Sequence, residues 1–96
     1  MSASKTYCVY FMSDPSHAVL YIGVTGDLER RVSEHKAHAL EGFTKTYDAT
    51  ELVYCESFSN ADEAIAREKQ LKKWTRAKKN ALVYRTNPTW EDLGKK

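Results

Sequence analysis

The fold of this chain is decided by one segment, Tyr21-Ile22-Gly23-Val24-Thr25-Gly26-Asp27-Leu28-Glu29-Arg30-Arg31-Val32-Ser33-Glu34-His35. Its first part is typical of a β-strand, and Gly26 and Asp27 then predict a tight turn into a helix that has Asp27 as its N-cap. At 3.6 residues per turn, Arg31 and His35 share one side of this helix. The apolar residues on the same side are Leu28, Val32 and Ala39. We therefore expect Arg31 and His35 to face the interior.

A β-hairpin is predicted at the start of the chain, and its second strand opens this segment. Residues 6–12 are rich in aromatic and β-branched types, which predicts the first strand. The second strand should span residues 18–25 and have one fully aliphatic face. Residues 13–17 between them are typical of a turn, so the two strands should pair antiparallel. This pairing would bring Tyr10 and Tyr21 close together.

A third strand and a second helix are predicted further along the chain. The strand should span residues 51–58. Ser59 and Asp62 stand three residues apart and resemble a capping box, which predicts a helix over residues 60–73.

The last third of the chain predicts one more helix and a turn. Thr75 is a suitable N-cap for the helix, which should end before Asn87 because the following residue is a proline. Trp90 should fold back on the domain in a short turn. Residues 41–50 have no clear period and are typical of a loop. Its candidate contact residues are Phe43, Lys45 and Tyr47.

Length and composition predict a single domain that does not span a membrane. The 96 residues suffice for one core, and we expect a single domain over residues 1–96, frayed at residues 1–5 and 94–96. The chain lacks the apolar stretch of a signal peptide and the ~20 apolar residues of a membrane span. Cys8 and Cys55 lie in separate apolar runs, so we expect buried free thiols and a cytoplasmic protein.

The positive charge is concentrated in one part of the chain. The formal net charge is only +2, yet seven of the thirteen residues from 67 to 79 are Lys or Arg. Such a basic run predicts contacts with the phosphate backbone of a nucleic acid. The residues expected to make these contacts are Lys72, Lys73, Arg76, Lys78 and Lys79.

Glu68 lies in the middle of the apolar side of the second predicted helix. Burying a carboxylate is costly unless a cation or hydrogen-bond donors meet it. One interpretation is a structural ion pair with a neighbouring Lys or Arg. The other is a metal ligand facing a cleft, since Mg²⁺ can be held by one carboxylate when a substrate phosphate supplies further oxygens.

Several segments in a fixed order resemble the GIY-YIG nuclease superfamily. They begin with Cys8-Val9-Tyr10 and, ten residues later, Tyr21-Ile22-Gly23, and the similarity is greatest to the small bacterial stand-alone members. The matching positions and segments that follow are Val24-Thr25, Arg31, His35, Gly42-Phe43-Thr44, Glu68-Lys69-Gln70-Leu71-Lys72 and Asn87-Pro88-Thr89-Trp90. One departure is Cys8, where the family has glycine, and it affects strand packing more than chemistry.

The resemblance implies an α+β fold, a small three-stranded, mixed, mostly antiparallel sheet flanked by helices in the order β-β-α-β-α-α. It implies a phosphodiesterase that acts on nucleic acid with Mg²⁺ or Mn²⁺. By position, the residues implied are the motif tyrosines Tyr10 and Tyr21, the catalytic arginine Arg31, the histidine of some members His35, and the metal-binding glutamate Glu68. Gly23 and Asn87 would have supporting roles. Some members use an asparagine after the glutamate helix, for which Asn80 is the alternative to Asn87.

These groups together predict an endonuclease that acts on single-stranded, duplex or branched DNA. Tyr10 would activate water by passing its proton toward His35, and Arg31 would stabilise the transition state. Tyr21 would orient water or phosphate, and Glu68 would hold the metal ion. We expect weak sequence preference, or selectivity by strand structure or by a partner protein. Two alternatives are a non-catalytic nucleic-acid-binding module on the same fold and a structural adaptor that binds a protein. The adaptor would use Trp74, Tyr84 or Trp90.

Overall fold

A computed structural model describes residues 5–38 and 47–95 of the chain. The order of elements is strand, strand, helix, strand, helix, helix, as predicted. The elements are β1 (Tyr7–Ser13), β2 (Leu20–Thr25), α1 (Leu28–Lys36), β3 (Glu51–Phe58), α3 (Ala61–Lys72) and α4 (Arg76–Thr86).

The three strands form one sheet in the order β2-β1-β3, and both strand pairs are antiparallel. The predicted α+β architecture is therefore confirmed, but the prediction of a mixed sheet is wrong, because the described strands pair only antiparallel. In the register, Tyr10 lies opposite Gly23 on one side and opposite Cys55 on the other, while Met12 lies opposite Tyr21. Because residues that face each other across strands share a face of the sheet, Tyr10, Tyr21 and Gly23 belong to one face.

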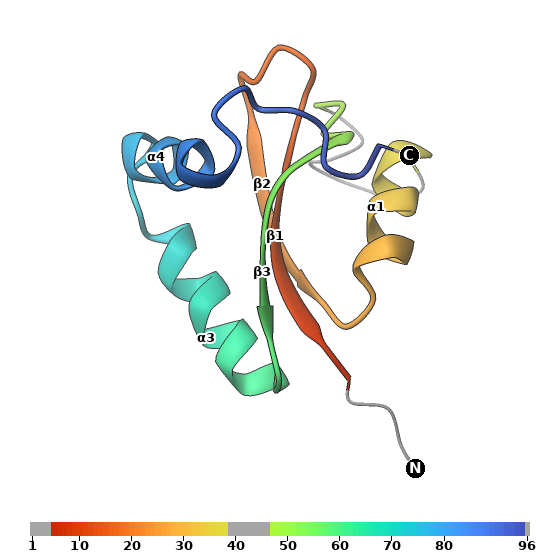
Figure 1. The fold of residues 1–96 in the computed structure, drawn as a ribbon, viewed down its shortest axis with the longest axis vertical. Coiled ribbons are helices and arrows are strands. Elements are labelled where there is room, and N and C mark those ends of the chain that lie inside the picture. The colour runs from red at the N-terminus through yellow and green to blue at the C-terminus, as the bar shows by residue number, and fades with distance from the viewer. Residues whose placement is uncertain (1–4, 39–46, 96) are drawn as a thin grey trace.

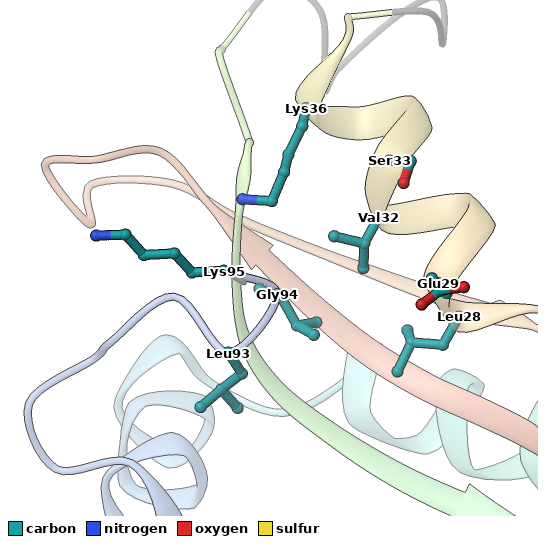
Figure 2. Close-up of a pocket in the computed structure, with 9 residues that line it drawn as sticks. Leu28, Glu29, Val32, Ser33, Lys36, Leu93, Gly94 and Lys95 are labelled. Carbon is teal, nitrogen blue, oxygen red and sulfur yellow. The ribbon is translucent and has the colours of Figure 1, made fainter.

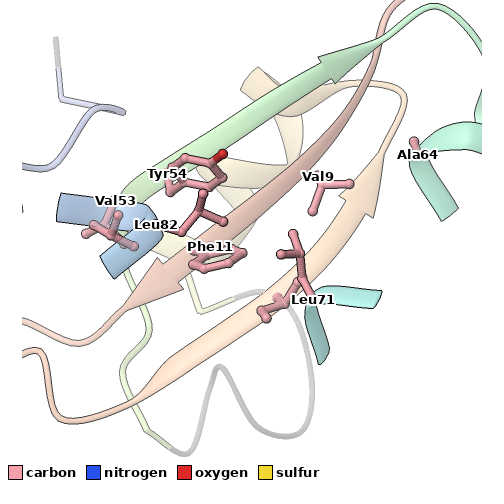
Figure 3. Packing of buried hydrophobic residues seen from close by; sticks show 9 residues of the cluster. Val9, Phe11, Val53, Tyr54, Ala64, Leu71 and Leu82 are labelled. Atoms are coloured by element: carbon pink, nitrogen blue, oxygen red, sulfur yellow. The ribbon is translucent and has the colours of Figure 1, made fainter. Parts of the chain in front are cut away.

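The helices cover both faces of the sheet (Figure 1). The α3 and α4 helices lie on one side and α1 lies on the other. The core under α3 and α4 contains Val9, Phe11, Ile22, Val53, Tyr54, Ala64, Leu71, Leu82 and Val83. Figure 3 shows Phe11 of β1 among these side chains. The second core lies on the α1 side and contains Tyr10, Met12, Val32, Ala49 and Leu52. The alternation predicted for β1 is thus confirmed, because its odd- and even-numbered residues enter different cores.

Two of the three predicted helix N-caps are confirmed. Asp27 accepts a hydrogen bond from the Arg30 N–H at 3.1 Å, and Thr75 accepts one from the Lys78 N–H. The capping box at Ser59 is wrong by one residue, because Asn60 has the extended backbone of a cap and accepts from Glu63 N at 2.8 Å. An asparagine cap satisfies the same free N–H groups of the first turn.

Two further sequence expectations are corrected by the structure. Cys55 is exposed, not buried, because β3 is an edge strand and its burial decreases after Tyr54. Gly26 does not have the left-handed backbone that only glycine readily adopts, so the turn before α1 does not require this glycine.

Several expectations fall at the limits of the described chain. Ala39, the Gly42-Phe43-Thr44 segment and Lys45 lie outside the described residues, whereas Tyr47 is exposed. Gly94 is half-buried and donates its N–H to Asp92 Oδ1 at 3.0 Å. In the part of the chain that the structure describes, no helix has the length and apolar character needed to cross a membrane.

Candidate active site

The centre of the candidate site is a contact between β1 and α1. The Tyr10 Oη atom lies 3.1 Å from His35 Nε2, and both residues are almost completely buried. Tyr10 reaches this position because β1 directs its even-numbered residues toward α1. His35 reaches it from the last turn of α1, on the inward side predicted from the helical period. A phenol and an imidazole are therefore paired inside the molecule.

Tyr21 brings a second phenol to the same place from β2. Its ring centroid lies 6.2 Å from that of Tyr10 and 5.3 Å from that of His35. Unlike those two side chains, Tyr21 is only half-buried. The half-buried Tyr21 ring thus lies between the surface and the buried Tyr10–His35 pair.

Gly23 leaves the space that the Tyr10 phenol occupies. A Cβ atom at this position would lie 2.6 Å from Tyr10 Oη and 2.7 Å from Tyr10 Cζ. These distances are well inside van der Waals contact, so any larger residue would displace the ring. The supporting role predicted for Gly23 thus has a steric basis in this structure.

Arg31 lies one helical turn before His35, at the border between the buried rings and solvent. Its side chain is 41% exposed, so the guanidinium can meet a substrate. Glu34 lies 3.5 Å from the Arg31 guanidinium and also pairs with Arg30, and these contacts orient Arg31. Sequence reasoning did not single out Glu34, although its spacing of three and four residues from two arginines is typical of helix ion pairs.

The surroundings set the protonation states of the central pair. Burial is the main cause that raises the pKa of Tyr10, followed by the nearby Tyr21, while Arg31 opposes the rise. Burial also lowers the pKa of His35, and the positive charge of Arg31 adds to this effect. At neutral pH, Tyr10 is therefore a phenol and His35 a neutral imidazole. The imidazole can then accept a proton from the phenol.

The second ring nitrogen of His35, Nδ1, does not take part in the contact with Tyr10. Nδ1 is buried and makes no hydrogen bond with any described residue. If Tyr10 donates to Nε2, the tautomer of neutral His35 carries its proton on Nδ1. No second group then competes with Tyr10 for the basic nitrogen.

Glu68 lies on α3, which is on the opposite side of the sheet from α1 (Figure 1). It follows the buried Ala64 by one turn of α3 and precedes the buried Leu71, and its side chain is 14% exposed. The Lys72 ammonium lies 3.1 Å from the carboxylate, so the structural ion pair considered above is present. The charge of Glu68 nevertheless acts on the phenol, because it is among the causes that raise the pKa of Tyr10.

The donor set suits an ion that is delivered with a substrate better than a permanent metal centre. Among residues 5–38 and 47–95, no three His, Cys, Asp or Glu side chains are grouped closely enough to hold a metal ion. Glu68 offers one half-buried carboxylate. One carboxylate is sufficient for Mg²⁺ only when water and substrate phosphate complete its shell of oxygens.

Arg76 has a structural role that its sequence position did not predict. Its guanidinium donates to the carbonyl oxygens of His17 and Ala18, both at 2.9 Å, and its Nε donates to Asn80. Each of the three nitrogens makes one hydrogen bond, and the contact of Arg76 with phosphate stays a prediction that these bonds do not test. The residue fastens the turn between β1 and β2 to α4.

Both asparagines considered for the site are engaged elsewhere. Asn80 Oδ1 accepts from Arg76. Asn87 is buried, and its Nδ2 donates to the carbonyls of Val53 and Glu91 while its Oδ1 accepts from the Glu91 N–H. Asn87 therefore fixes the turn that follows α4, which agrees with a supporting role and not with contact to substrate.

The remaining basic candidates stand at the surface of α3 and α4. Lys72, Lys73 and Lys78 are exposed, and Lys79 is half-buried. Lys72 is partly neutralised by Glu68. The surface cations of this region are available for contacts with an extended polyanion.

A sizeable hollow lies on another side of α1. It measures about 670 Å³ and separates α1 from the C-terminal segment. Figure 2 shows Val32 and Leu28 of α1 facing it, with Leu93 on the opposite side. Tyr10, Tyr21 and His35 do not line this hollow. Its size therefore does not identify it as the site of the chemistry.

Comparison with known proteins finds similarity over most of the chain. A family model described as the GIY-YIG catalytic domain matches residues 6–81. A UPF0213 protein of Haloquadratum walsbyi is 37% identical over 77 residues, which cover 80% of this chain and 86% of that protein. A UPF0213 protein of Natronomonas pharaonis is 42% identical over 64 residues, covering 67% and 75% of the two chains.

A solved structure has a similar fold. The solution NMR structure of a UPF0213 protein from Bacillus halodurans has a TM-score of 0.58 and 26% sequence identity to this chain. The alignment covers 91% of this chain and 92% of that one. The similarity therefore extends over the sheet and the helices together.

Proposed function

This chain belongs to the GIY-YIG family, and from that premise we propose that it is a divalent-metal-dependent endonuclease that hydrolyses phosphodiester bonds in DNA. The matched residues 6–81 contain every side chain to which we assign a step. Cytoplasmic location is part of the proposal, since both cysteines are free, as is typical of proteins in a reducing compartment.

The contact between Tyr10 and His35 carries the proposal. The two residues are 25 positions apart, and the fold holds them at hydrogen-bond distance in a buried environment beside Arg31 and Tyr21. The hydrogen bond satisfies two polar groups that are buried, and it also places a proton acceptor next to a phenol. Proton transfer during catalysis is a function that requires both.

We assign water activation to this pair. A phenol with a raised pKa is a poor base by itself at neutral pH. Tyr10 can accept a proton from the attacking water only as it gives its own proton to His35 Nε2. The water oxygen forms a bond to phosphorus, and the bond between phosphorus and the 3′ oxygen breaks. His35 finishes the step as an imidazolium ion, which the carboxylate of Glu34 favours.

Arg31, Tyr21 and Glu68 complete the assignment. The half-exposed Arg31 guanidinium would bind the non-bridging phosphate oxygens, on which negative charge develops. The phenol of Tyr21 would orient the phosphate or the water. Glu68 would hold a Mg²⁺ or Mn²⁺ ion, which supplies Lewis-acid stabilisation of the departing oxygen when it is bound. Lys72 must then release the Glu68 carboxylate.

The basic surface of α3 and α4 would hold the DNA backbone. Lys73 and Lys78 are exposed and can contact phosphates without reading bases. We therefore expect binding that weakens strongly with salt and depends little on sequence.

A cleavage assay with matched carboxylate variants tests the proposal. Pure protein is incubated with labelled single-stranded, duplex and branched DNA in Mg²⁺, in Mn²⁺ and in EDTA. We expect metal-dependent cutting, lost to background in Glu68→Ala and retained in Glu63→Ala, because Glu63 is an exposed acid of the same helix. Binding of DNA at low salt should survive in both variants.

Two results would redirect the conclusion. DNA binding without cutting under any metal condition would favour the non-catalytic binding module. Full cleavage by Glu68→Ala would remove the metal-binding role from this residue.

A further inference from the structure

A second surface feature is a groove between α4, the turn that joins β1 to β2, and the chain that follows α4. It encloses about 590 Å³. The residues that line this aromatic groove are His17, Asn80, Ala81, Tyr84, Arg85 and Trp90. None of them is among the residues assigned to the chemistry above. The groove combines three aromatic rings with a guanidinium and a primary amide.

The walls of the aromatic groove are held in place by two side chains. Arg76 fastens the His17 side through its hydrogen bonds to the carbonyls of His17 and Ala18. Asn87 fixes the other side, because its backbone carbonyl accepts from the Trp90 N–H and its amide bonds twice to Glu91. The hydrogen bonds of Arg76 and Asn87 therefore hold the aromatic groove in shape before any ligand binds.

The backbone at both walls has a positive φ, which is unusual for Trp90 and more common for a histidine such as His17. His17 has φ of 63° and Trp90 has φ of 56°, in the left-handed region. This region is unfavourable for a bulky residue such as tryptophan, and such strain is concentrated at functional sites. His17 and Trp90 also contact each other, with ring centroids 5.2 Å apart.

Tyr84 presents an unusually open ring on the α4 side of the groove. It is the most exposed of the large apolar residues in the described chain, at 63%. Arg85 follows it, and the basic residues of α3 and of the start of α4 precede it. A flat, polar-edged and uncharged group attached to a polyanion would match this combination of rings and cations.

We propose that the aromatic groove binds an unpaired nucleobase of a single strand. The proposal rests on the proposed function, because it gives the same enzyme a preference for DNA with an unpaired segment. The base would stack on Tyr84, with Trp90 and His17 lining the rest of the groove. The Arg85 guanidinium and the Nδ2 amide group of Asn80, whose Oδ1 accepts from Arg76, would meet its polar edge or the adjoining phosphate. Bases within duplex DNA are already stacked and cannot enter.

A binding experiment without turnover tests this proposal. Fluorescence anisotropy in EDTA measures the affinity for a labelled 12-nucleotide single strand, for the same backbone without bases, and for a blunt duplex. Base stacking on one aromatic side chain typically contributes about 5- to 100-fold in affinity. We expect Tyr84→Ala to lose about that much for the single strand and nothing for the baseless strand or the duplex.

Two further variants separate stacking from other effects. Tyr84→Phe keeps the ring and should bind the single strand like the wild type. Ile65→Ala removes another exposed apolar side chain, one that lies on α3 and does not line the aromatic groove, and should leave all three affinities unchanged.

The outcomes distinguish this inference from the proposed function. Equal losses of affinity for the normal and the baseless strand, or no loss for either, would overturn the groove proposal. Base-dependent binding that Tyr84→Ala abolishes, in a protein that never cuts DNA, would support the groove while refuting the nuclease. Cleavage of DNA by a protein whose affinity for the single strand does not change in Tyr84→Ala would support the nuclease and refute the groove proposal.

Discussion

Replacing Gly23 by alanine should disable the candidate site through one methyl group. Gly23 lies within β2 and its backbone is not in the left-handed region, so alanine itself is conformationally acceptable there. The new Cβ would, however, lie 2.6 Å from Tyr10 Oη, whereas ordinary contact begins at 3.4 Å. The phenol would have to withdraw by about 0.8 Å.

A displacement of this size is large compared with the hydrogen bond that it disturbs. Tyr10 Oη and His35 Nε2 are 3.1 Å apart, and the buried ring has no empty space into which it can move without strain. Misplacement of a reacting group by 1 Å costs about 10²-fold in rate. We therefore expect a 30- to 100-fold fall in kcat, in line with that figure. Overpacking should reduce the free energy of unfolding by about 1–3 kcal/mol.

Single-turnover cleavage of labelled DNA in Mg²⁺ measures the effect, with thermal unfolding to verify that the variant is folded. Gly26→Ala is the matched control. A Cβ at Gly26 would meet the end of the flexible Lys5 side chain, which can move, so this variant should cleave at the wild-type rate. Tyr10→Phe provides the reference for complete loss of the phenol oxygen.

A double variant sharpens the test. If Gly23→Ala acts by displacing the phenol oxygen, it should cause little further loss of rate in a Tyr10→Phe background, because groups that act as a unit are not additive. Wild-type cleavage by folded Gly23→Ala would refute the argument that the position of the Tyr10 oxygen controls the reaction.

Three further predictions concern charge. Arg31→Ala should lower kcat by at least ~10²-fold, as is usual when one charge-stabilising donor is removed, and near-normal turnover would disprove its assignment. Because burial lowers the pKa of His35, the acidic limb of the rate profile should lie below pH ~6.5, the ordinary histidine value. It should disappear in His35→Gln, and an unchanged limb would exclude His35 as the proton acceptor. Replacing Lys78 and Lys79 by alanine should lower the salt dependence of duplex binding by a slope of about 0.9 for each lost phosphate contact. An unchanged slope would exclude both lysines from the DNA surface.

The sequence alone predicted the order and type of the elements, and for several of them the side that faces the interior. The alternation of β1 placed Tyr10 and Met12 on one face, and the period of α1 placed His35 inward. The same period also placed Arg31 inward, where the structure has its side chain 41% exposed. Thr75 and the proline after Asn87 marked the two ends of α4. These features follow from backbone geometry and hydrogen bonding within a few residues, so a local pattern is sufficient to determine them.

The roles of several polar side chains depended on partners that are distant in sequence. Arg76 belongs to a run of cations, yet its guanidinium is held by carbonyls 58 and 59 positions away. Asn87 bonds to Val53, and Cys55 is exposed because its strand lies at the edge of the sheet. A local pattern does not show which remote atoms will meet a given side chain.

The motif, the order of elements and the buried faces were thus properties of the sequence itself. Only the tertiary structure decided that the Tyr10 phenol lies over Gly23 against His35, and that hydrogen bonds of Arg76 and Asn87 hold the two sides of a groove. The physical reason is that side-chain direction follows from the period of one element. Hydrogen-bond partners and open space, in contrast, arise only when separate elements pack together.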